Sequence, residues 1–263
     1  MEYTWILAPV LLLGSVAHAQ ETAGNRPFLF IAHRGASYLA PENTLASINL
    51  AWELGADAAE CDVMLTSDDR VIVFHDKNTG RLTEKNDVVS ETPWKDLSEL
   101  TVRPRETNLP DYGSERIPLL EEVLKTIPEG RMLVIEIKTG TEILPWLKMD
   151  VDRYWKSGSI AFIAFDLETI RQAKLIFPEV PCYYLSTFRK DLRKHFDAIV
   201  DSGLDGVDLR HGMIDRRLVG KCNEAGLDVW CWTVNDPATA RELKDIGVTA
   251  VTTDRPDWLR QNL

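Results

Sequence analysis

The architecture is first indicated by the stretch Phe28-Leu29-Phe30-Ile31-Ala32-His33-Arg34-Gly35-Ala36. Residues 28–32 are apolar or small, which predicts a buried strand that ends where the polar residues begin. In parallel α/β folds the chemistry lies at this carboxyl end of the strands. Histidine is the residue type that ordinarily titrates near neutral pH, Arg34 offers a planar fork suited to phosphate, and Gly35 lets the backbone turn sharply. The stretch is therefore a candidate active-site corner, and the alternative is an ordinary strand followed by a turn.

Length and charge limit the class of protein. The 263 residues are 44% hydrophobic and 27% charged, which suits a single α/β barrel of about 250 residues. The formal net charge of -11 argues against binding of nucleic acid or of an anionic membrane through bulk charge. We therefore expect no nucleic-acid partner and no stable membrane insertion. An anionic substrate would need local cations or a bound metal, and the oligomeric state stays open.

Residues 1–19 have the pattern of a secretory signal peptide. The apolar block Trp5–Leu13 precedes Gly14-Ser15-Val16-Ala17-His18-Ala19, which ends in the small-residue pattern of a cleavage site. The block is much shorter than the roughly 20 residues that span a bilayer. Glu2 is the only charged residue before it, whereas signal peptides carry basic residues there, so an N-terminal arm is the alternative. We expect residues 20–263 to be exported, either to the periplasm or by secretion.

The cysteines do not form a recognisable framework. The chain has four of them, which is few for a disulfide scaffold in a domain of this size. Their spacing matches no zinc-binding pattern. The sequence therefore predicts four buried free thiols, which are Cys61, Cys182, Cys222 and Cys231.

Two carboxylates mark the second predicted strand, residues 58–64. Glu60 and Asp62 are two positions apart, so on a strand they face the same side. Two carboxylates on one face of an otherwise apolar strand are costly to bury without a cation. This pattern predicts a metal site, and the alternative is an exposed edge strand with a polar face.

A hairpin and an insertion follow this strand. Residues 66–69 are too few for a crossover to a parallel strand, so residues 71–74 should pair antiparallel with residues 58–64. His75 then lies beside the barrel, near the two carboxylates, as a candidate acid or base. Residues 77–117 are polar and irregular, apart from one short helical turn near Trp94. We expect an insertion or a lid over the barrel mouth, and the alternative is a disordered linker.

The remaining chain alternates strands and helices. The first helix has Asn43 as its expected N-cap and Gly55 as its stop, and another begins with Pro118 in its first turn. Counting strands without the hairpin gives eight, the number that closes an α/β TIM (β/α)8 barrel. The expected strands are 28–32, 58–64, 132–138, 160–165, 182–185, 206–209, 227–233 and 250–253. The later helices are 141–156, 167–177, 190–202, 215–225 and 237–246.

Seven short motifs, in this order, resemble those of the glycerophosphodiester phosphodiesterase family. Each is weak alone, but together they are a strong signal, because each lies at the end of a predicted strand or hairpin. The resemblance covers the chain from Phe28 to its end. The motifs are His33-Arg34-Gly35, Pro41-Glu42-Asn43-Thr44, Glu60-x-Asp62, His75-Asp76, Glu136-x-Lys138, Trp232-Thr233-Val234-Asn235 and Thr253-Asp254-Arg255-Pro256.

The resemblance implies a role for each site residue. It implies a TIM barrel with an insertion after the His-Asp motif, and a catalytic pair made by His33 and His75. Arg34 and Lys138 match the positions that hold the phosphate, and Trp232 matches an aromatic residue near the glycerol. The implied metal ligands are Glu60, Asp62 and Glu136. Three carboxylates without a histidine or cysteine ligand favour a hard cation, Ca²⁺ or Mg²⁺.

The expected function is metal-dependent hydrolysis of glycerophosphodiesters to glycerol 3-phosphate and an alcohol, by acid/base catalysis with two histidines. The alternative is a phospholipase D-like or phosphoinositide phospholipase C-like phosphodiesterase. A non-catalytic protein that binds a phosphate ligand is a further alternative. The sequence leaves open the preferred alcohol, the choice of cation, and which histidine is the base. It also leaves open whether water or the substrate's own hydroxyl is the nucleophile.

Overall fold

The computed structural model describes residues 27–104, 112 and 115–263, so the expected signal peptide lies outside the described residues. The strands are β1 (Leu29–Ala32), β2 (Ala58–Leu65), β3 (Val71–Val73), β4 (Met132–Ile137), β5 (Ser159–Ala164), β6 (Cys182–Ser186), β7 (Gly206–Arg210), β8 (Asp228–Trp232) and β9 (Ala250–Thr253). The helices are α1 (Leu45–Glu53), α2 (Trp94–Leu97), α3 (Leu120–Leu124), α4 (Leu144–Tyr154), α5 (Leu167–Ile176), α6 (Arg189–Asp201), α7 (Arg216–Glu224), α8 (Pro237–Asp245) and α9 (Pro256–Gln261). Within the described ranges, no helix combines the length and apolar character needed to cross a membrane.

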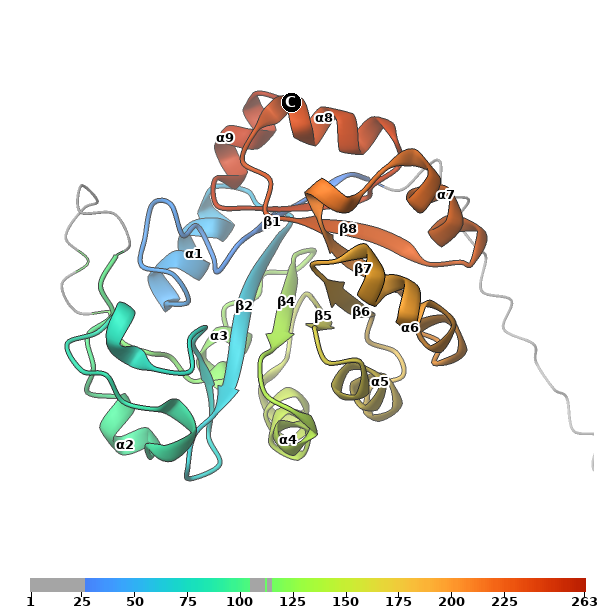
Figure 1. The fold of residues 1–263 in the computed structure, drawn as a ribbon. Coiled ribbons are helices and arrows are strands. Elements are labelled where there is room, and N and C mark those ends of the chain that lie inside the picture. The colour runs from blue at the N-terminus through green and yellow to red at the C-terminus, as the bar shows by residue number, and fades with distance from the viewer. Residues whose placement is uncertain (1–26, 105–111, 113–114) are drawn as a thin grey trace, which may run out of the picture.

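The strands close into the expected barrel. Their order is β1-β9-β8-β7-β6-β5-β4-β2-β3, and β1 also pairs with β2. Every neighbouring pair is parallel except β2 and β3, which form the expected antiparallel hairpin with Val63 opposite Val73. Figure 1 shows the helices arranged around the outside of the strands. The TIM barrel and its added hairpin are both confirmed.

The alternation of side chains along the strands separates the interior of the barrel from its helix-facing side. On β2, Cys61 and Val63 join the large core beneath the helices, whereas Ala58 belongs to the interior cluster. In the interior of the barrel, the rings of Tyr183 of β6 and Trp230 of β8 stack with their centroids 3.8 Å apart. These rings help to fill the interior of the barrel, which is therefore a packed core.

The cysteines behave as the sequence predicts. All of them are free and buried, and Cys61 and Cys231 lie on strands β2 and β8. Burial raises the pKa of Cys61 well above the ordinary thiol value. A buried neutral thiol packs as a small apolar side chain, so these residues contribute to the core rather than to chemistry.

The insertion forms a small lobe with its own apolar core. Two 3₁₀ turns, Thr79–Arg81 and Val89–Glu91, precede α2, and Figure 1 shows α2 beside the barrel near the end of β2. The lobe's core includes Met64 of β2 and Ile72 of β3, which fasten it to the hairpin. The full cluster is Met64, Ile72, Phe74, Leu82, Val89, Leu97, Leu100, Val102, Ile117 and Leu119, with Trp94 against it. The described part of the insertion is therefore packed, and the disordered-linker alternative is wrong for it.

The expected N-cap of α1 is wrong by one residue. Thr44, not Asn43, caps this helix, and its hydroxyl accepts a 3.2 Å hydrogen bond from the backbone N–H of Ser47. Asn43 instead has a φ of +58°, a left-handed conformation that asparagine tolerates better than most residues. Its side chain instead donates a hydrogen bond to Asp62 of β2. The predicted stop at Gly55, where φ is +77°, is confirmed.

Three other helix assignments need correction. Pro118 lies before α3, and its carbonyl accepts a 2.8 Å hydrogen bond from the N–H of Val73. The helix expected over 141–156 is divided into a 3₁₀ turn, Thr141–Ile143, and α4. Helix α9 was not predicted, although Pro256 in its first turn is a favourable start signal. Its six residues are too few for a clear apolar period.

Replacing Gly35 with alanine is expected to lower stability more than replacing Gly55. Both glycines have a left-handed φ, +75° and +77°, which costs about 1–2 kcal/mol for other residues. A Cβ at Gly35 would also lie 2.5 Å from the backbone carbon of Ser47, whereas nothing lies within 4 Å of a Cβ at Gly55. Gly55→Ala is therefore the matched control. Urea unfolding should give a clearly larger loss for Gly35→Ala, and equal losses would contradict this reading of the turn.

Candidate active site

Polar residues at the carboxyl ends of the strands surround a cavity of about 270 Å³. Its lining brings together seven of the eight site residues expected from the sequence. These are His33, Arg34, Glu60, His75, Glu136, Lys138 and Trp232. The eighth, Asp62, is fully buried behind them and groups with Glu60 and Glu136. The remaining lining residues are Ile163, Phe165, Leu185, Asp208, Thr233 and Thr252.

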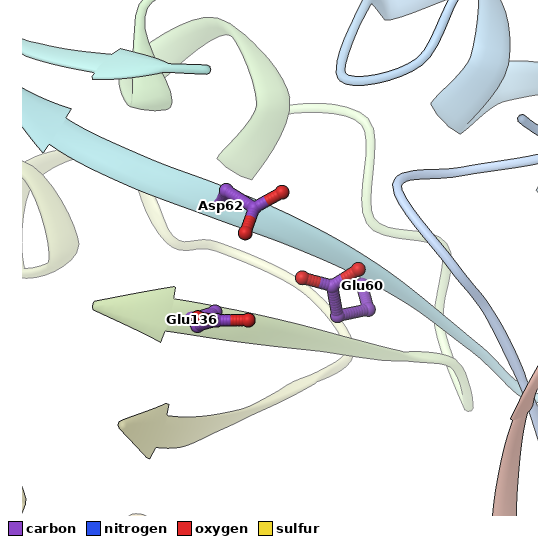
Figure 2. A group of neighbouring side chains, drawn as sticks. All are labelled: Glu60, Asp62 and Glu136. Carbon is purple, nitrogen blue, oxygen red and sulfur yellow. The ribbon is translucent and has the colours of Figure 1, made fainter. Parts of the chain in front are cut away.

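The three acidic residues form one cluster. Asp62 of β2 lies directly opposite Glu136 of β4 in the strand register, and Glu60 precedes Asp62 by two positions on the same face. One carboxylate oxygen from each residue lies within 4.8 Å of the others. Figure 2 shows the three carboxyl groups gathered beside β2 and β4. Glu60 and Glu136 are 76 positions apart in the sequence. The parallel pairing of β2 with β4 brings them together in a single site.

The cluster is electrostatically strained. Burial, with the charges of the neighbouring carboxylates, raises the pKa of Glu60 well above its ordinary value. Burial and the charge of Asp62 raise the pKa of Glu136 to about 7. Burial acts in the same direction on Asp62, but Arg34 and Lys138 hold the pKa of that carboxyl below its ordinary value. Asp62 is thus an anion at neutral pH, and its two neighbours ionise fully only when additional positive charge is present.

The donor set fits a hard divalent cation. Glu60 Oε1 and Asp62 Oδ1 are buried and have no hydrogen-bond partner. Buried polar atoms without a partner are unfavourable, so each is a candidate ligand atom. The cluster contains only oxygen donors, the type that Ca²⁺ and Mg²⁺ prefer. These residues fit either ion, and their arrangement favours neither.

Each histidine is oriented by a carboxylate. His33 follows β1, and its Nδ1 lies 2.7 Å from Asp254 Oδ1. His75 follows β3, and its Nδ1 lies 2.6 Å from Asp76 Oδ1. Because a carboxylate only accepts hydrogen bonds, Nδ1 carries the hydrogen in both rings and Nε2 is the nitrogen left for a ligand. Burial, helped by nearby positive charge, lowers the pKa of His75.

Arg34 is held rigidly at the cavity. Its φ of +53° turns the chain sharply after β1. Its backbone N–H donates a 2.8 Å hydrogen bond to Glu60 Oε2, and its Nη1 donates a 2.7 Å bond to Glu42 Oε1. Its Nε, 3.3 Å from Asp62 Oδ2, has no hydrogen-bond partner. The guanidinium therefore keeps one unused buried donor beside the acidic cluster.

Lys138 and Trp232 occupy different sides of the cavity. Lys138 Nζ lies 2.8 Å from Glu136 Oε1 and 3.5 Å from Asp62 Oδ1. Trp232, at the end of β8, packs edge-to-face against Phe165 with the ring centroids 5.7 Å apart. The charged lining of the cavity thus comes from β2 and β4, and its aromatic lining comes from Phe165, just after β5, and from Trp232. This division suits a small molecule with an anionic group at one end.

Known proteins support the same interpretation. The sequence profile of the glycerophosphoryl diester phosphodiesterase family matches residues 33–258. The chain belongs to this family. Its match begins at His33 and includes every site residue described above.

Relatives of this phosphodiesterase cover nearly the same length. A Bacillus subtilis protein with a provisional glycerophosphodiester phosphodiesterase name is 32% identical over 87% of this chain and 95% of its own. A rat lysophospholipase D is 26% identical over 89% of this chain and 85% of its own. The structure of an Oleispira antarctica phosphodiesterase in complex with the product sn-glycerol-3-phosphate has a TM-score of 0.83 and 28% identity, with 90% and 96% of the two chains covered. This chain is accordingly a phosphoric diester hydrolase with a TIM barrel.

Further residues of the phosphodiesterase contact the candidate site residues, although the motifs alone did not indicate these contacts. Asn43 Nδ2 donates a 2.8 Å hydrogen bond to Asp62 Oδ2, and Asn43 Oδ1 accepts a 3.1 Å bond from the backbone N–H of Asp62. Glu42 is buried and pairs with both Arg34 and Arg81. Arg81 also donates to Asp76. The Pro41-Glu42-Asn43-Thr44 motif marked Glu42 and Asn43 in the sequence, but it did not indicate which residues they contact.

The expectation of a lid over the barrel mouth is not supported by the described residues. Within 77–104, 112 and 115–117, no residue lines the cavity of this phosphodiesterase. Arg81 reaches toward the site only through Asp76 and Glu42. The lobe therefore contacts the site indirectly, through the bonds from Arg81 to Asp76, which follows His75, and to Glu42. Residues 105–111, 113 and 114 lie outside the described part.

Proposed function

We propose that this phosphodiesterase hydrolyses glycerophosphodiesters to glycerol 3-phosphate and an alcohol, with a divalent cation and two histidines. The observation that carries the proposal is that two carboxylate-paired histidines line the same cavity as the acidic cluster. The neighbouring Oleispira structure holds sn-glycerol-3-phosphate, which supports a small phosphate ester as the ligand here.

Glu60, Asp62 and Glu136 would hold Ca²⁺ or Mg²⁺. When bound, such a cation polarises phosphoryl oxygens and offsets the charge of the carboxylates. Arg34 and Lys138 contribute positive charge from the protein itself, which an enzyme with a net charge of -11 needs in order to attract an anion. The unused Nε donor of Arg34 suits a phosphoryl oxygen.

The two histidines would exchange protons with the reacting groups. Hydrolysis requires removal of a proton from the nucleophile and donation of one to the leaving alcohol. His75 has a lowered pKa and is neutral at pH 7, so it suits the base. His33 then remains for the acid. Asp76 and Asp254 fix the Nδ1–H tautomers, which leaves both Nε2 atoms available to the substrate.

A second candidate substrate class is suggested by one relative. The rat protein is named a lysophospholipase D, so release of a headgroup from lysophospholipids is a reaction to be compared directly. A phospholipase C-like reaction would instead release a cyclic phosphate. A non-catalytic role does not fit a site that retains both histidines and all three carboxylates.

The products distinguish these reactions. We expect glycerol 3-phosphate when the enzyme, supplied with Ca²⁺ or Mg²⁺, is offered glycerophosphocholine, glycerophosphoethanolamine, glycerophosphoinositol and glycerophosphoglycerol. Lysophosphatidylcholine and phosphatidylinositol serve as comparison substrates, and phosphorus NMR identifies the products. Turnover of lysophosphatidylcholine alone, or a stable cyclic phosphate from phosphatidylinositol alone, would overturn the proposal.

A further inference from the structure

A buried carboxyl group in the cavity has no part in the mechanism described so far. Asp208, at the middle of β7, is 1% exposed and lines the cavity. Its Oδ1 is buried and has no hydrogen-bond partner. Its register neighbours are Leu185 on β6 and Trp230 on β8, both apolar and buried. The surrounding strands therefore provide no side-chain partner at these two positions.

The acidic cluster does not explain this residue either. The group of carboxylates that could share one cation contains Glu60, Asp62 and Glu136, from β2 and β4, and does not include Asp208. In the described part of the chain, no lysine, arginine or histidine forms an ion pair with Asp208. A buried carboxyl with an unpaired oxygen is unfavourable for folding, so its place beside a cavity points to a partner supplied by the ligand.

The surroundings of Asp208 define the chemistry of that partner. Burial, and to a lesser extent the charge of Glu136, raises the pKa of Asp208 well above its ordinary value. A neutral carboxyl both donates and accepts hydrogen bonds, and it repels no phosphate. The indole N–H of Trp232 donates a 3.3 Å hydrogen bond to the backbone carbonyl of Asp208, which places the indole N–H beside β7 at this residue. A small alcohol group, itself both donor and acceptor, matches this position better than a charged ammonium group.

The geometry points to a hydroxyl-binding subsite on the β7 side of the cavity. We propose that Asp208 is a specificity-determining residue that hydrogen-bonds a hydroxyl group of the glycerol moiety, an assignment that rests on the function proposed above. The phosphate would lie at the opposite, charged side, near Arg34 and Lys138. The subsite would distinguish polyol phosphates from phosphate esters that lack hydroxyl groups.

Calorimetric binding to the cation-loaded enzyme tests this assignment without turnover. The probes are sn-glycerol 3-phosphate, propyl phosphate, which lacks both hydroxyls, and inorganic phosphate. In the wild type we expect glycerol 3-phosphate to bind about 10-fold more tightly than propyl phosphate, as for the loss of one good hydrogen bond. Asp208→Leu should remove that preference and leave the affinity for inorganic phosphate unchanged. Asp208→Asn, which keeps a donor and an acceptor, should retain most of the preference.

Stability provides a second readout that separates binding from structure. Asp208→Leu removes a buried polar group without a partner, so its Tm should equal or exceed that of the wild type. Asp201→Asn, a substitution at an exposed residue of α6, is the matched control for loss of one carboxylate.

Equal wild-type affinities for glycerol 3-phosphate and propyl phosphate would overturn the assignment, even if the leucine variant failed to fold. So would a variant in which all three affinities fall by the same factor. Absence of diester hydrolysis together with an intact hydroxyl preference would overturn the proposed function and leave the subsite standing.

Discussion

Replacing His75 with alanine is expected to lower kcat by about 10²–10⁴-fold, the usual contribution of a positioned acid or base. The imidazole lines the cavity, and Asp76 holds its Nδ1–H. Cation binding should be nearly unchanged, because His75 is not among the clustered carboxylates. Steady-state kinetics and cation calorimetry on the same preparation measure both quantities. A kcat near the wild-type value would remove His75 from the mechanism.

The pH dependence of kcat provides a second test of the role of His75. Burial lowers the pKa of His75, so the neutral form required of a base is lost only as the pH falls below the ordinary range of histidine. The wild type should show a bell-shaped profile of kcat with its acidic limb in that region, and His75→Ala should lack that limb. His195→Ala is the matched control, because this imidazole lies on α6 and bonds to Tyr184 outside the cavity. An unchanged acidic limb in His75→Ala would assign the limb to another group.

Replacing Glu60 with glutamine is expected to weaken cation binding by more than about 100-fold, since even indirect partners of a ligand contribute 10–100-fold. The kcat/KM should fall by about 10²–10³-fold, equivalent to a few kcal/mol of lost charge stabilisation. Calorimetry with Ca²⁺ and with Mg²⁺, followed by assays at saturating cation, measures both losses. Undiminished cation affinity in Glu60→Gln would exclude this residue as a ligand.

The same variant should become more stable in the absence of cation. The pKa of Glu60 is raised, so its ionised form is disfavoured in the folded protein at pH 8. A neutral glutamine removes this cost, and the Tm in excess chelator should rise by about 2–4 °C for each kcal/mol relieved. Asp62→Asn should lower the Tm, because the pKa of Asp62 is lowered in the folded protein. Glu53→Gln, exposed on α1, is the control and should change neither stability nor binding. A lower Tm for Glu60→Gln would contradict this account of the cluster.

The barrel could be predicted because most of its strands are short apolar runs, and because polar motifs follow several of them, as after β1, β4 and β9. The i, i+2 spacing of Glu60 and Asp62 correctly placed both on one face of β2. The four residues 66–69 correctly implied a hairpin, because a parallel crossover cannot be that short. Roles assigned by family resemblance to Glu136, Lys138 and Trp232 stay predictions, although all three lie at the cavity.

The contacts between loops could not be predicted. The sequence predicts Asn43 as a helix cap. In the structure it has a left-handed φ, and its side-chain amide donates a hydrogen bond to Asp62. Arg81 lies in a polar insertion without periodicity, so its bond to the buried Glu42 has no local signal. Asp208 follows a valine in an ordinary strand pattern, and its unpaired oxygen becomes visible only when β6, β7 and β8 are assembled.

Release of glycerol 3-phosphate from a glycerophosphodiester, measured with and without a chelator, tests whether the cation and the two histidines act together. We expect excess chelator to abolish release by the wild type and added Ca²⁺ or Mg²⁺ to restore it. We also expect that no cation concentration restores release by His75→Ala. Full wild-type activity in excess chelator would contradict the cation site built from Glu60, Asp62 and Glu136.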